Sequence, residues 1–325
     1  MNVSLLPQIQ SEPLIGTAVT AATFILLETP HPWIKPALLS DGVPESLRQV
    51  VKSQLGPESG VRVHLIANEQ TATQQQRRMF VFQQVLPSLR KRGSQRLARR
   101  LVHEYEGWVI QVDTPEDMAP ALSKFLASSA QANRANYTRM APEQRHLMIC
   151  THATHNECCG VYGYPFYQTT IARIRELGLT QQIHPWEITH IGGHRFAPTL
   201  IDWPQGRYYG NLDETSLMLL LQQKGAIAPL LATYRGWSLL PKPLQVLEAE
   251  LFQQHGWDWL QGRVAGRILN QHEAHKQFRI ELWFESAEQQ LSRYTAEVCQ
   301  NVLQTYQLES DVEQDSNRLL HRKTG

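Results

Sequence analysis

The cysteine and histidine residues of this chain are concentrated in one short stretch, and this crowding constrains the fold more than any other feature. Three of the four cysteines, Cys150, Cys158 and Cys159, lie within ten residues of one another. Six of the 13 histidines lie between His146 and His194, in the same part of the sequence. Spread cysteines are typical of a disulfide framework, whereas crowded thiols beside imidazoles are typical of a metal or redox site. The pattern therefore predicts such a site.

Two pairs in this stretch have spacings that suit a shared centre: Cys150-x8-Cys159 and His190-x3-His194. Both pairs are expected in loops, because Cys150 ends a short apolar run and the two glycines between the histidines oppose a helix. The double glycine also permits a tight turn and leaves N–H groups free beside a bulky group. Two thiolates and two imidazoles can hold either zinc or a mixed-ligand [2Fe–2S] cluster. The gap between the cysteines exceeds the usual two to four residues of structural zinc sites, which is a mild argument against zinc, and spacing alone does not choose iron over zinc.

The order of the other sequence patterns predicts an α/β protein. Apolar runs and alternating patterns predict strands at residues 18–27, 61–66, 79–85 and 108–112. Helical spacing predicts a helix at residues 44–55, and a Pro-containing acidic start predicts another at residues 113–127. The polar stretch 128–144 is the predicted linker. This first part reads as an N-terminal α/β region, residues 1–135.

A second α/β pattern follows, predicted as a domain over residues 140–238. It has strands at 147–149 and 186–191, a helix at 167–177, a hairpin from 196–203 and 207–209, and a helix at 213–224. A C-terminal α+β extension, residues 239–325, is expected to contain a helix to about residue 254 and strands at 264–269 and 278–284. The last ~15 residues are polar and are expected to be disordered.

Composition and charge exclude several classes of protein. Hydrophobic residues make up 42 % of the chain and charged residues 19 %, which is enough apolar side chain for a globular core. The net charge of +1 gives no global field for nucleic acid or an anionic membrane, so neither is an expected partner. The first 13 residues lack the basic start of a signal peptide, and the longest apolar run, residues 16–27, is shorter than the roughly 20 residues of a membrane span. We therefore expect a cytoplasmic protein.

Longer motifs around these pairs resemble the sucrase/ferredoxin-like family of thioredoxin-like ferredoxins. They are CTHATHNECCG at residues 150–160, THIGGHRFAPT at 189–199 and PQGRYYG at 204–210. Upstream, EPLIGTA at residues 12–18 and ETPHPW at 28–33 are similar to the family's amino-terminal pattern. The resemblance extends over roughly residues 12–235. It implies a thioredoxin-like ferredoxin domain with an additional N-terminal α/β region.

The resemblance also implies a cofactor and its ligands. The cofactor would be a [2Fe–2S] cluster, with Cys150 and Cys159 as thiolate ligands and His190 and His194 as nitrogen ligands. Cys159 is preferred to Cys158 because its spacing matches the family, and adjacent side chains point in different directions. Cys158 is then either a packed thiol or a replacement ligand.

The implied function is one-electron transfer, as a carrier more than as a stand-alone enzyme, fed by a redox partner such as a flavoprotein reductase. Replacing two thiolates by neutral imidazoles should raise the potential of the cluster, as in Rieske centres. Reduction should also raise the pKa of a ring N–H on an iron-bound imidazole, so we expect electron uptake to be proton-coupled.

Two other functions are compatible with the residues. One is a zinc-stabilised interaction module that uses the same four side chains, and the other is a thiol–disulfide oxidoreductase that uses Cys158 and Cys159. Taken singly, a buried cysteine or histidine is more often structural than a ligand. Cys299 lies far from the others and is expected to be a structural thiol. We find no carboxylate pair that could be assigned to the sugar cleavage in the family's name.

Two further groups of residues have a structural and a functional interpretation. A dense basic run is most often a solvated surface, and otherwise a docking patch for an acidic redox partner; its members are Arg90, Lys91, Arg92, Arg96, Arg99 and Arg100. Aromatic residues near the motifs are expected to be core packing and not an electron path; they are Trp186, Trp203, Tyr208 and Tyr209.

Overall fold

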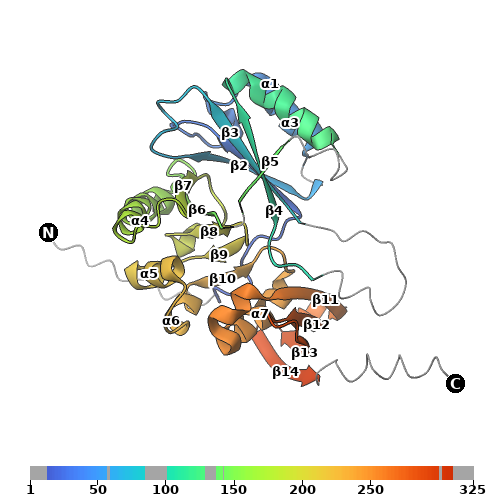
Figure 1. Cartoon of the computed structure of the whole chain (residues 1–325). Coiled ribbons are helices and arrows are strands. Elements are labelled where there is room, and N and C mark those ends of the chain that lie inside the picture. Colours follow the sequence, from blue (N-terminus) through green and yellow to red (C-terminus); the bar gives the residue numbers. More distant parts are fainter. Residues whose placement is uncertain are drawn as a thin grey trace.

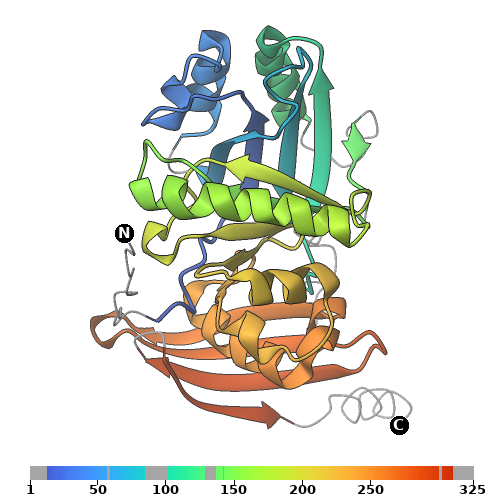
Figure 2. The same cartoon turned by 90° about the vertical axis from the view of Figure 1, so that its left-hand side faces the viewer.

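The computed structural model describes residues 13–56, 59–84, 101–128, 137–141, 143–299 and 302–309. These residues form two sheets. The larger sheet has ten strands in the order β10-β9-β8-β6-β7-β2-β1-β3-β4-β5, and the smaller has four in the order β11-β12-β13-β14. Figure 1 shows α1 and α3 at one end of the molecule and the smaller sheet at the other. Between these ends, α4 crosses the middle of the molecule (Figure 2).

The N-terminal unit is a β-α-β-β-β-α arrangement at one end of the large sheet. Its elements are β1 (Thr23–Glu28), α1 (Glu45–Gln54), β2 (Val61–Ala67), β3 (Arg77–Gln83), β4 (Glu106–Val112) and α3 (Met118–Ala127). β1 and β2 are parallel, whereas β3 is antiparallel to β1 and β4 is antiparallel to β3. The short strand β5 (Thr138–Arg139) pairs with the edge of β4.

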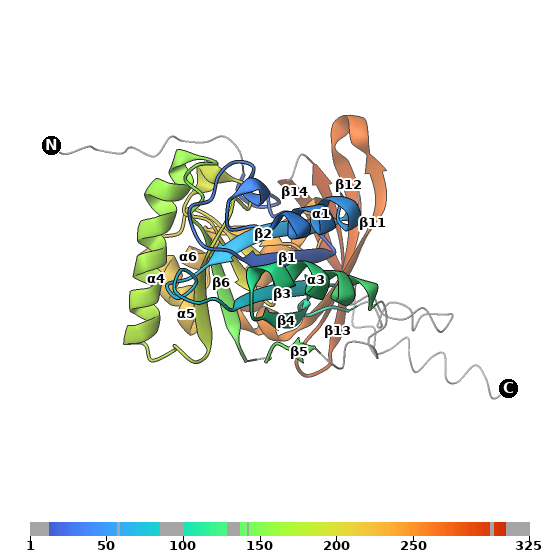
Figure 3. The ribbon, with the colours of Figure 1, turned by 90° about the horizontal axis from the view of Figure 1, so that it is seen from above.

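The two helices of the N-terminal unit cover the same face of its strands (Figure 3). Each has apolar side chains at helical spacing: Leu47 and Val51 in α1, Leu122 and Phe125 in α3. The helix expected from residue 113 begins with a short 3₁₀ turn, in which the Thr114 N–H donates to the Asp117 carboxylate at 3.2 Å. Both predicted helices of this region are thus confirmed.

The central unit repeats the same order of elements. It consists of β6 (Arg145–Cys150), α4 (Tyr164–Glu176), β7 (Ile183–Ile188), β8 (Leu200–Trp203), β9 (Arg207–Tyr209) and α5 (Glu214–Gln222). β6 and β7 are parallel, β8 is antiparallel to β6, and β9 is antiparallel to β8. A sheet in the order β7-β6-β8-β9 with both helices packed together is the thioredoxin-like arrangement, so the predicted fold class is confirmed. The N-terminal unit has this topology too, which no sequence repeat had indicated.

The two units join edge to edge through antiparallel pairing of β2 with β7. Ile66 lies opposite Ile188 at this junction. Within the units, Glu28 lies opposite Ile66 and Cys150 lies opposite Ile188. Glu28 and Cys150 therefore occupy equivalent positions in the two units, which are related by a local twofold axis at this junction. All four cysteines lie outside the N-terminal unit, and its equivalent of Cys150 is a buried carboxylate.

The C-terminal segment packs a helix on the smaller sheet. Its elements are α6 (Ala228–Leu231), β10 (Tyr234–Trp237), α7 (Lys242–His255), β11 (Arg263–His272), β12 (Gln277–Glu285), β13 (Leu291–Cys299) and β14 (Val302–Glu309). A buried ion pair ties α7 to the central unit, with Arg207 Nη1 2.6 Å from Glu248 Oε1. The predicted helix to residue 254 and the strands near 264–269 and 278–284 are confirmed, whereas β13 and β14 were not predicted.

Some sequence predictions are not tested by this fold. The large sheet contains strands from both sides of residue 135. The division of the chain into separate domains at residues 1–135, 140–238 and 239–325 stays a prediction. The basic run at residues 90–100 and the polar tail after residue 310 lie outside the described residues. None of the helices formed by the described residues is long and apolar enough to span a bilayer.

Candidate metal centre

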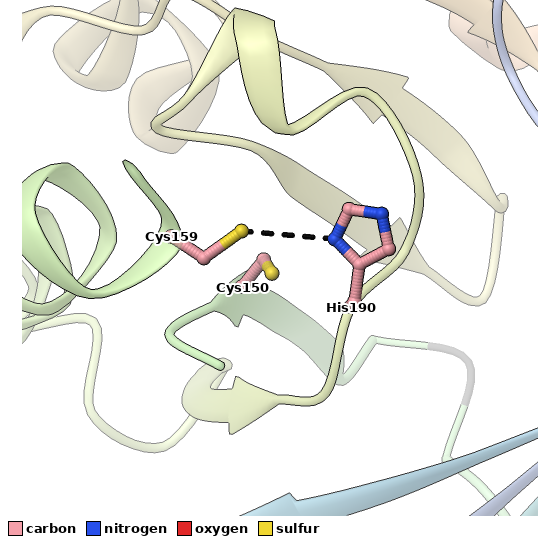
Figure 4. Close-up of side chains that lie close together, drawn as sticks. All are labelled: Cys150, Cys159 and His190. Atoms are coloured by element: carbon pink, nitrogen blue, oxygen red, sulfur yellow. Dashed lines mark hydrogen bonds between the residues drawn. The ribbon is translucent and has the colours of Figure 1, made fainter. Parts of the chain in front are cut away.

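Three segments of the central unit bring two thiols and an imidazole together, and the two cysteines lie in a strand end and a helical turn instead of in the expected loops. Cys150 is the last residue of β6, Cys159 opens a π-helical turn before α4, and His190 follows β7. One ligand atom from each of these residues lies within 4.8 Å of the other two. Cys159 Sγ is 3.6 Å from His190 Nδ1, and Figure 4 shows both sulfur atoms beside the ring. Both cysteines are buried and the histidine is half-buried.

Two glycines allow the π-helical turn Cys159–Gly163 to lie against the end of β6. A Cβ atom at Gly163 would be 1.9 Å from the carbonyl oxygen of Cys150. A Cβ atom at Gly160 would be 2.6 Å from the Cβ atom of Ala153. Any larger residue at either position would therefore push Cys159 away from Cys150. The predicted helix at 167–177 is longer than expected, because this turn continues directly into α4.

The histidine loop depends on glycine in a different way. Gly192 and Gly193 have φ values of 83° and 73°, in the left-handed region that favours glycine, so the expected loop is confirmed. A Cβ atom at Gly193 would be 2.7 Å from the guanidinium of Arg235. That guanidinium donates to the carbonyl oxygen of Gly192 at 3.0 Å and to that of Thr17 at 2.9 Å. Arg235 therefore fixes the loop between the histidines.

Three of the four expected ligands lie close together in the structure, and His194 lies apart from them. His194 is exposed, and its ring centroid lies 5.9 Å from that of His190. It is not part of the close group formed by Cys150, Cys159 and His190 among the described residues, and its place in the ligand set stays a prediction. Cys158 is half-buried, and its backbone N–H donates to Asn156 Oδ1 at 3.0 Å. Among the described residues the close group contains Cys159 and not Cys158, and the choice of Cys159 as a ligand stays a prediction.

Two histidines outside the predicted ligand set also lie at the centre. The His155 ring stacks on the His190 ring with centroids 3.9 Å apart. His152 Nδ1 accepts from the backbone N–H of His190 at 3.4 Å. Both residues lie in the segment CTHATHNECC, so their closeness in sequence to the cysteines could have indicated them. Spacing alone does not show which imidazoles lie beside the thiols.

The N-terminal unit closes one side of the centre. His152 Nε2 lies 3.1 Å from the carbonyl oxygen of Ile34, and the Thr154 hydroxyl donates to the carbonyl oxygen of Trp33 at 2.7 Å. From β2, His64 also faces this region, and burial together with Arg62 lowers its pKa to about 4. The loop after β1 thus holds the loop between the two cysteines from outside the central unit.

The electrostatics of the centre favour one thiolate, at Cys150, because a hydrogen bond with Cys150 and burial raise the pKa of the Cys159 thiol, which keeps the proton. A hydrogen bond from the Cys159 thiol, and a further one from His190, hold the pKa of Cys150 well below its usual range. Burial and the neighbouring His190 lower the pKa of His155 to about 4, so this imidazole is neutral at neutral pH. A thiolate beside neutral imidazoles is the state in which these side chains coordinate a metal ion. The donor set therefore fits zinc or an iron–sulfur cluster.

The fold and the centre together define an α/β protein in which a thioredoxin-like unit carries a buried dithiol–imidazole site. The chain belongs to the sucrase/ferredoxin-like family, whose family model matches residues 14–236. This range includes both β-α-β-β-β-α units and ends within β10, so it leaves out α7 and the smaller sheet. The match confirms the family that the motifs indicated.

Other comparisons add little about the site. A thioredoxin-like [2Fe-2S] ferredoxin from Aquifex aeolicus is similar at 14 % sequence identity, with a TM-score of 0.26, over 30 % of this chain and 96 % of that chain. A search of curated proteins found no significant match.

Proposed function

We propose that this protein transfers single electrons through a [2Fe–2S] cluster held by Cys150, Cys159, His190 and His194. The observation that carries the proposal is the meeting of two buried thiols and an imidazole within 4.8 Å, where β6 ends, the turn before α4 begins and the chain leaves β7. The ferredoxin-like family of the chain supports it. A cluster of this kind, when bound, accepts and releases one electron at a time.

The residues of the chain would set the properties of the bound cluster. Cys150 and Cys159 would supply negative charge, whereas the histidines would supply none. Less negative charge on the ligands penalises the reduced state less, so the potential should lie above that of an all-thiolate ferredoxin. The buried residues Ile188 and Ile191, on either side of His190, limit the access of water. Proton coupling at the imidazoles stays a prediction, which midpoint potentials measured from about pH 6 to pH 10 would check.

A redox partner would approach from the side of the histidines. His194 is exposed, while the cysteines are buried, so electrons should enter and leave past the imidazoles. Val161, Tyr162 and Tyr164 directly follow Cys159 and are all exposed, with 58 %, 38 % and 49 % of their surfaces accessible. Exposed apolar side chains close in sequence to a proposed ligand are a surface that a docking protein can cover. A flavoprotein reductase is the partner that we propose.

The decisive experiment is purification without oxygen, followed by absorption and electron paramagnetic resonance spectra and by iron and sulfide analysis. We expect a brown protein with about two iron and two sulfide per chain, and a paramagnetic signal after one-electron reduction. A colourless protein with bound zinc would support the interaction module instead. A colourless metal-free protein that exchanges disulfides through Cys158 and Cys159 would support the oxidoreductase.

A further inference from the structure

A buried cation without a carboxylate partner lies behind the loop that carries the two histidines. Arg235, in β10, is only 1 % exposed. Its guanidinium donates to three uncharged oxygen atoms: the Thr17 hydroxyl at 3.1 Å, the Thr17 carbonyl at 2.9 Å and the Gly192 carbonyl at 3.0 Å. Among the residues that the structure describes, no aspartate or glutamate forms an ion pair with it.

A charge of this kind is unusual, because a buried ion is costly unless an opposite charge lies beside it. Two other arginines of the large sheet show the common arrangement: Arg207 lies 2.6 Å from Glu248, and Arg145 lies 2.6 Å from Asp202. Burial lowers the pKa of Arg235 to about 10, which still leaves the guanidinium charged at neutral pH. The fold thus keeps a positive charge out of water without an internal carboxylate to balance it.

The negative charge nearest in kind is at the metal centre. A Cβ atom at Gly193 would be 2.7 Å from Nη2 of Arg235, so the guanidinium lies directly against the backbone between His190 and His194. Although burial lowers the pKa of Arg235, the Cys150 thiolate opposes this shift, so the two charges attract each other. The cation is therefore placed to act on any negative charge that the centre holds.

We propose that Arg235 raises the reduction potential of the [2Fe–2S] cluster, because its buried positive charge stabilises the electron that the cluster accepts. The inference rests on the proposed function. With both irons ferric, the formal charges of the irons, sulfides and two thiolates cancel, so reduction leaves one negative charge. Arg235 attracts that charge through an interior that excludes water, where Coulomb interactions are stronger than in solvent. Its role thus goes beyond the hydrogen bond that holds the loop at Gly192.

The first test separates the charge of Arg235 from its hydrogen bonds. Arg235→Met and Arg235→Lys both lose the planar guanidinium, and only lysine keeps a positive charge. Redox titration of the brown protein, followed by absorption at about pH 6 so that a buried lysine keeps its proton, measures the potential of each. Arg235→Met should shift the equilibrium at least about tenfold towards the oxidised state, which is a potential about 59 mV lower. Arg235→Lys should stay within about threefold of the unaltered protein.

A second pair of variants keeps the arginine in place. The half-buried Thr17 accepts from Arg235 Nε, so Thr17→Asp would put a carboxylate beside the guanidinium, and Thr17→Asn has the same shape without the charge. If the cluster responds to charge at this position, Thr17→Asp should lower the potential by a similar amount relative to Thr17→Asn. In cluster-free protein, Thr17→Asp should melt at a higher temperature than Thr17→Asn, because only aspartate supplies a partner for the buried cation.

Two results would overturn the role of Arg235 alone. One is equal potentials in Arg235→Met and Arg235→Lys, which would assign the effect to the lost hydrogen bonds. The other is equal potentials in Thr17→Asp and Thr17→Asn, which decides the question if both Arg235 variants lose the cluster. Protein that binds no iron and sulfide would instead refute the proposed function, and the role of Arg235 would fall with it.

Discussion

Under the proposed function, Gly163→Ala should empty the proposed cluster site, although the substitution itself adds only one methyl group. The new Cβ atom would be 1.9 Å from the carbonyl oxygen of Cys150, where contacts under 3.0 Å essentially never occur. The turn or the end of β6 must therefore move by about 1 Å, whereas metal ligands tolerate roughly 0.5 Å. The movement separates Cys159 from Cys150, and iron content should fall to a small fraction of that of the unaltered protein.

Two opposing effects decide the stability of this variant. Gly163 has helical angles, φ −72° and ψ −44°, so alanine would gain about 1 kcal/mol from its helix propensity. Overpacking a rigid site costs about 1–3 kcal/mol, and the upper end applies here because the contact is with backbone. The cost of the clash should exceed the gain in helix propensity by about 2 kcal/mol, so the melting temperature should fall by roughly 4–8 °C.

A graded series controls for the effect of the methyl group alone. Gly160→Ala would meet the Ala153 Cβ atom at 2.6 Å, and its effect should be intermediate. Adding Ala153→Gly to that variant should restore the iron content, because the two methyl groups then no longer collide. Gly56→Ala, which has open space around it, should change neither iron content nor melting temperature. Full iron content in Gly163→Ala, measured by absorption and metal analysis, would refute the close-packing argument.

Three further outcomes are expected. Cys150→Ser and Cys159→Ser should each lose most of the iron and the visible absorption, while Cys158→Ser keeps both; the reverse pattern for the adjacent cysteines would move the ligand by one residue. His190→Cys, where the cluster survives, should lower the midpoint potential on the order of 100 mV by adding negative charge, and voltammetry showing no fall would contradict the ligand assignment. Glu248→Gln should cost about 3–5 kcal/mol in denaturant unfolding, because it leaves the buried Arg207 cation unpaired; a loss under 1 kcal/mol would mean that the pair is solvated.

The sequence predicted the local elements of the fold because they depend on local patterns. Cys150 was placed at a strand end from the apolar residues before it, and the structure has it as the last residue of β6. The loop around Gly192–Gly193 was expected from two adjacent helix-breaking residues, and both have positive φ values. Signals of this kind lie within a few residues of the feature that they predict.

The duplication of the fold could not be predicted in that way. The two units share the order and pairing of their elements, and their sequences show no repeat. Within the large sheet they are joined by a short antiparallel pairing, with Ile66 opposite Ile188 and Ala67 opposite Glu187. Two apolar strand ends look the same in a sequence whether or not they pair. The same reason explains why the stacking of His155 on His190 was missed, since it depends on the meeting of two separate loops.

The equivalent positions Glu28 and Cys150 show how the duplicated units differ in chemistry. Glu28 is 1 % exposed, and its carboxylate accepts from the Thr71 hydroxyl at 2.8 Å and from Arg78. Its oxygens are therefore satisfied within the N-terminal unit, which leaves this position no coordinating capacity to offer. The Cys150 thiol instead lies beside a second thiol and an imidazole, groups that can bind a metal ion. The N-terminal unit thus holds the loop between the cysteines through the carbonyl oxygens of Ile34 and Trp33, and the central unit carries the thiols and the imidazoles.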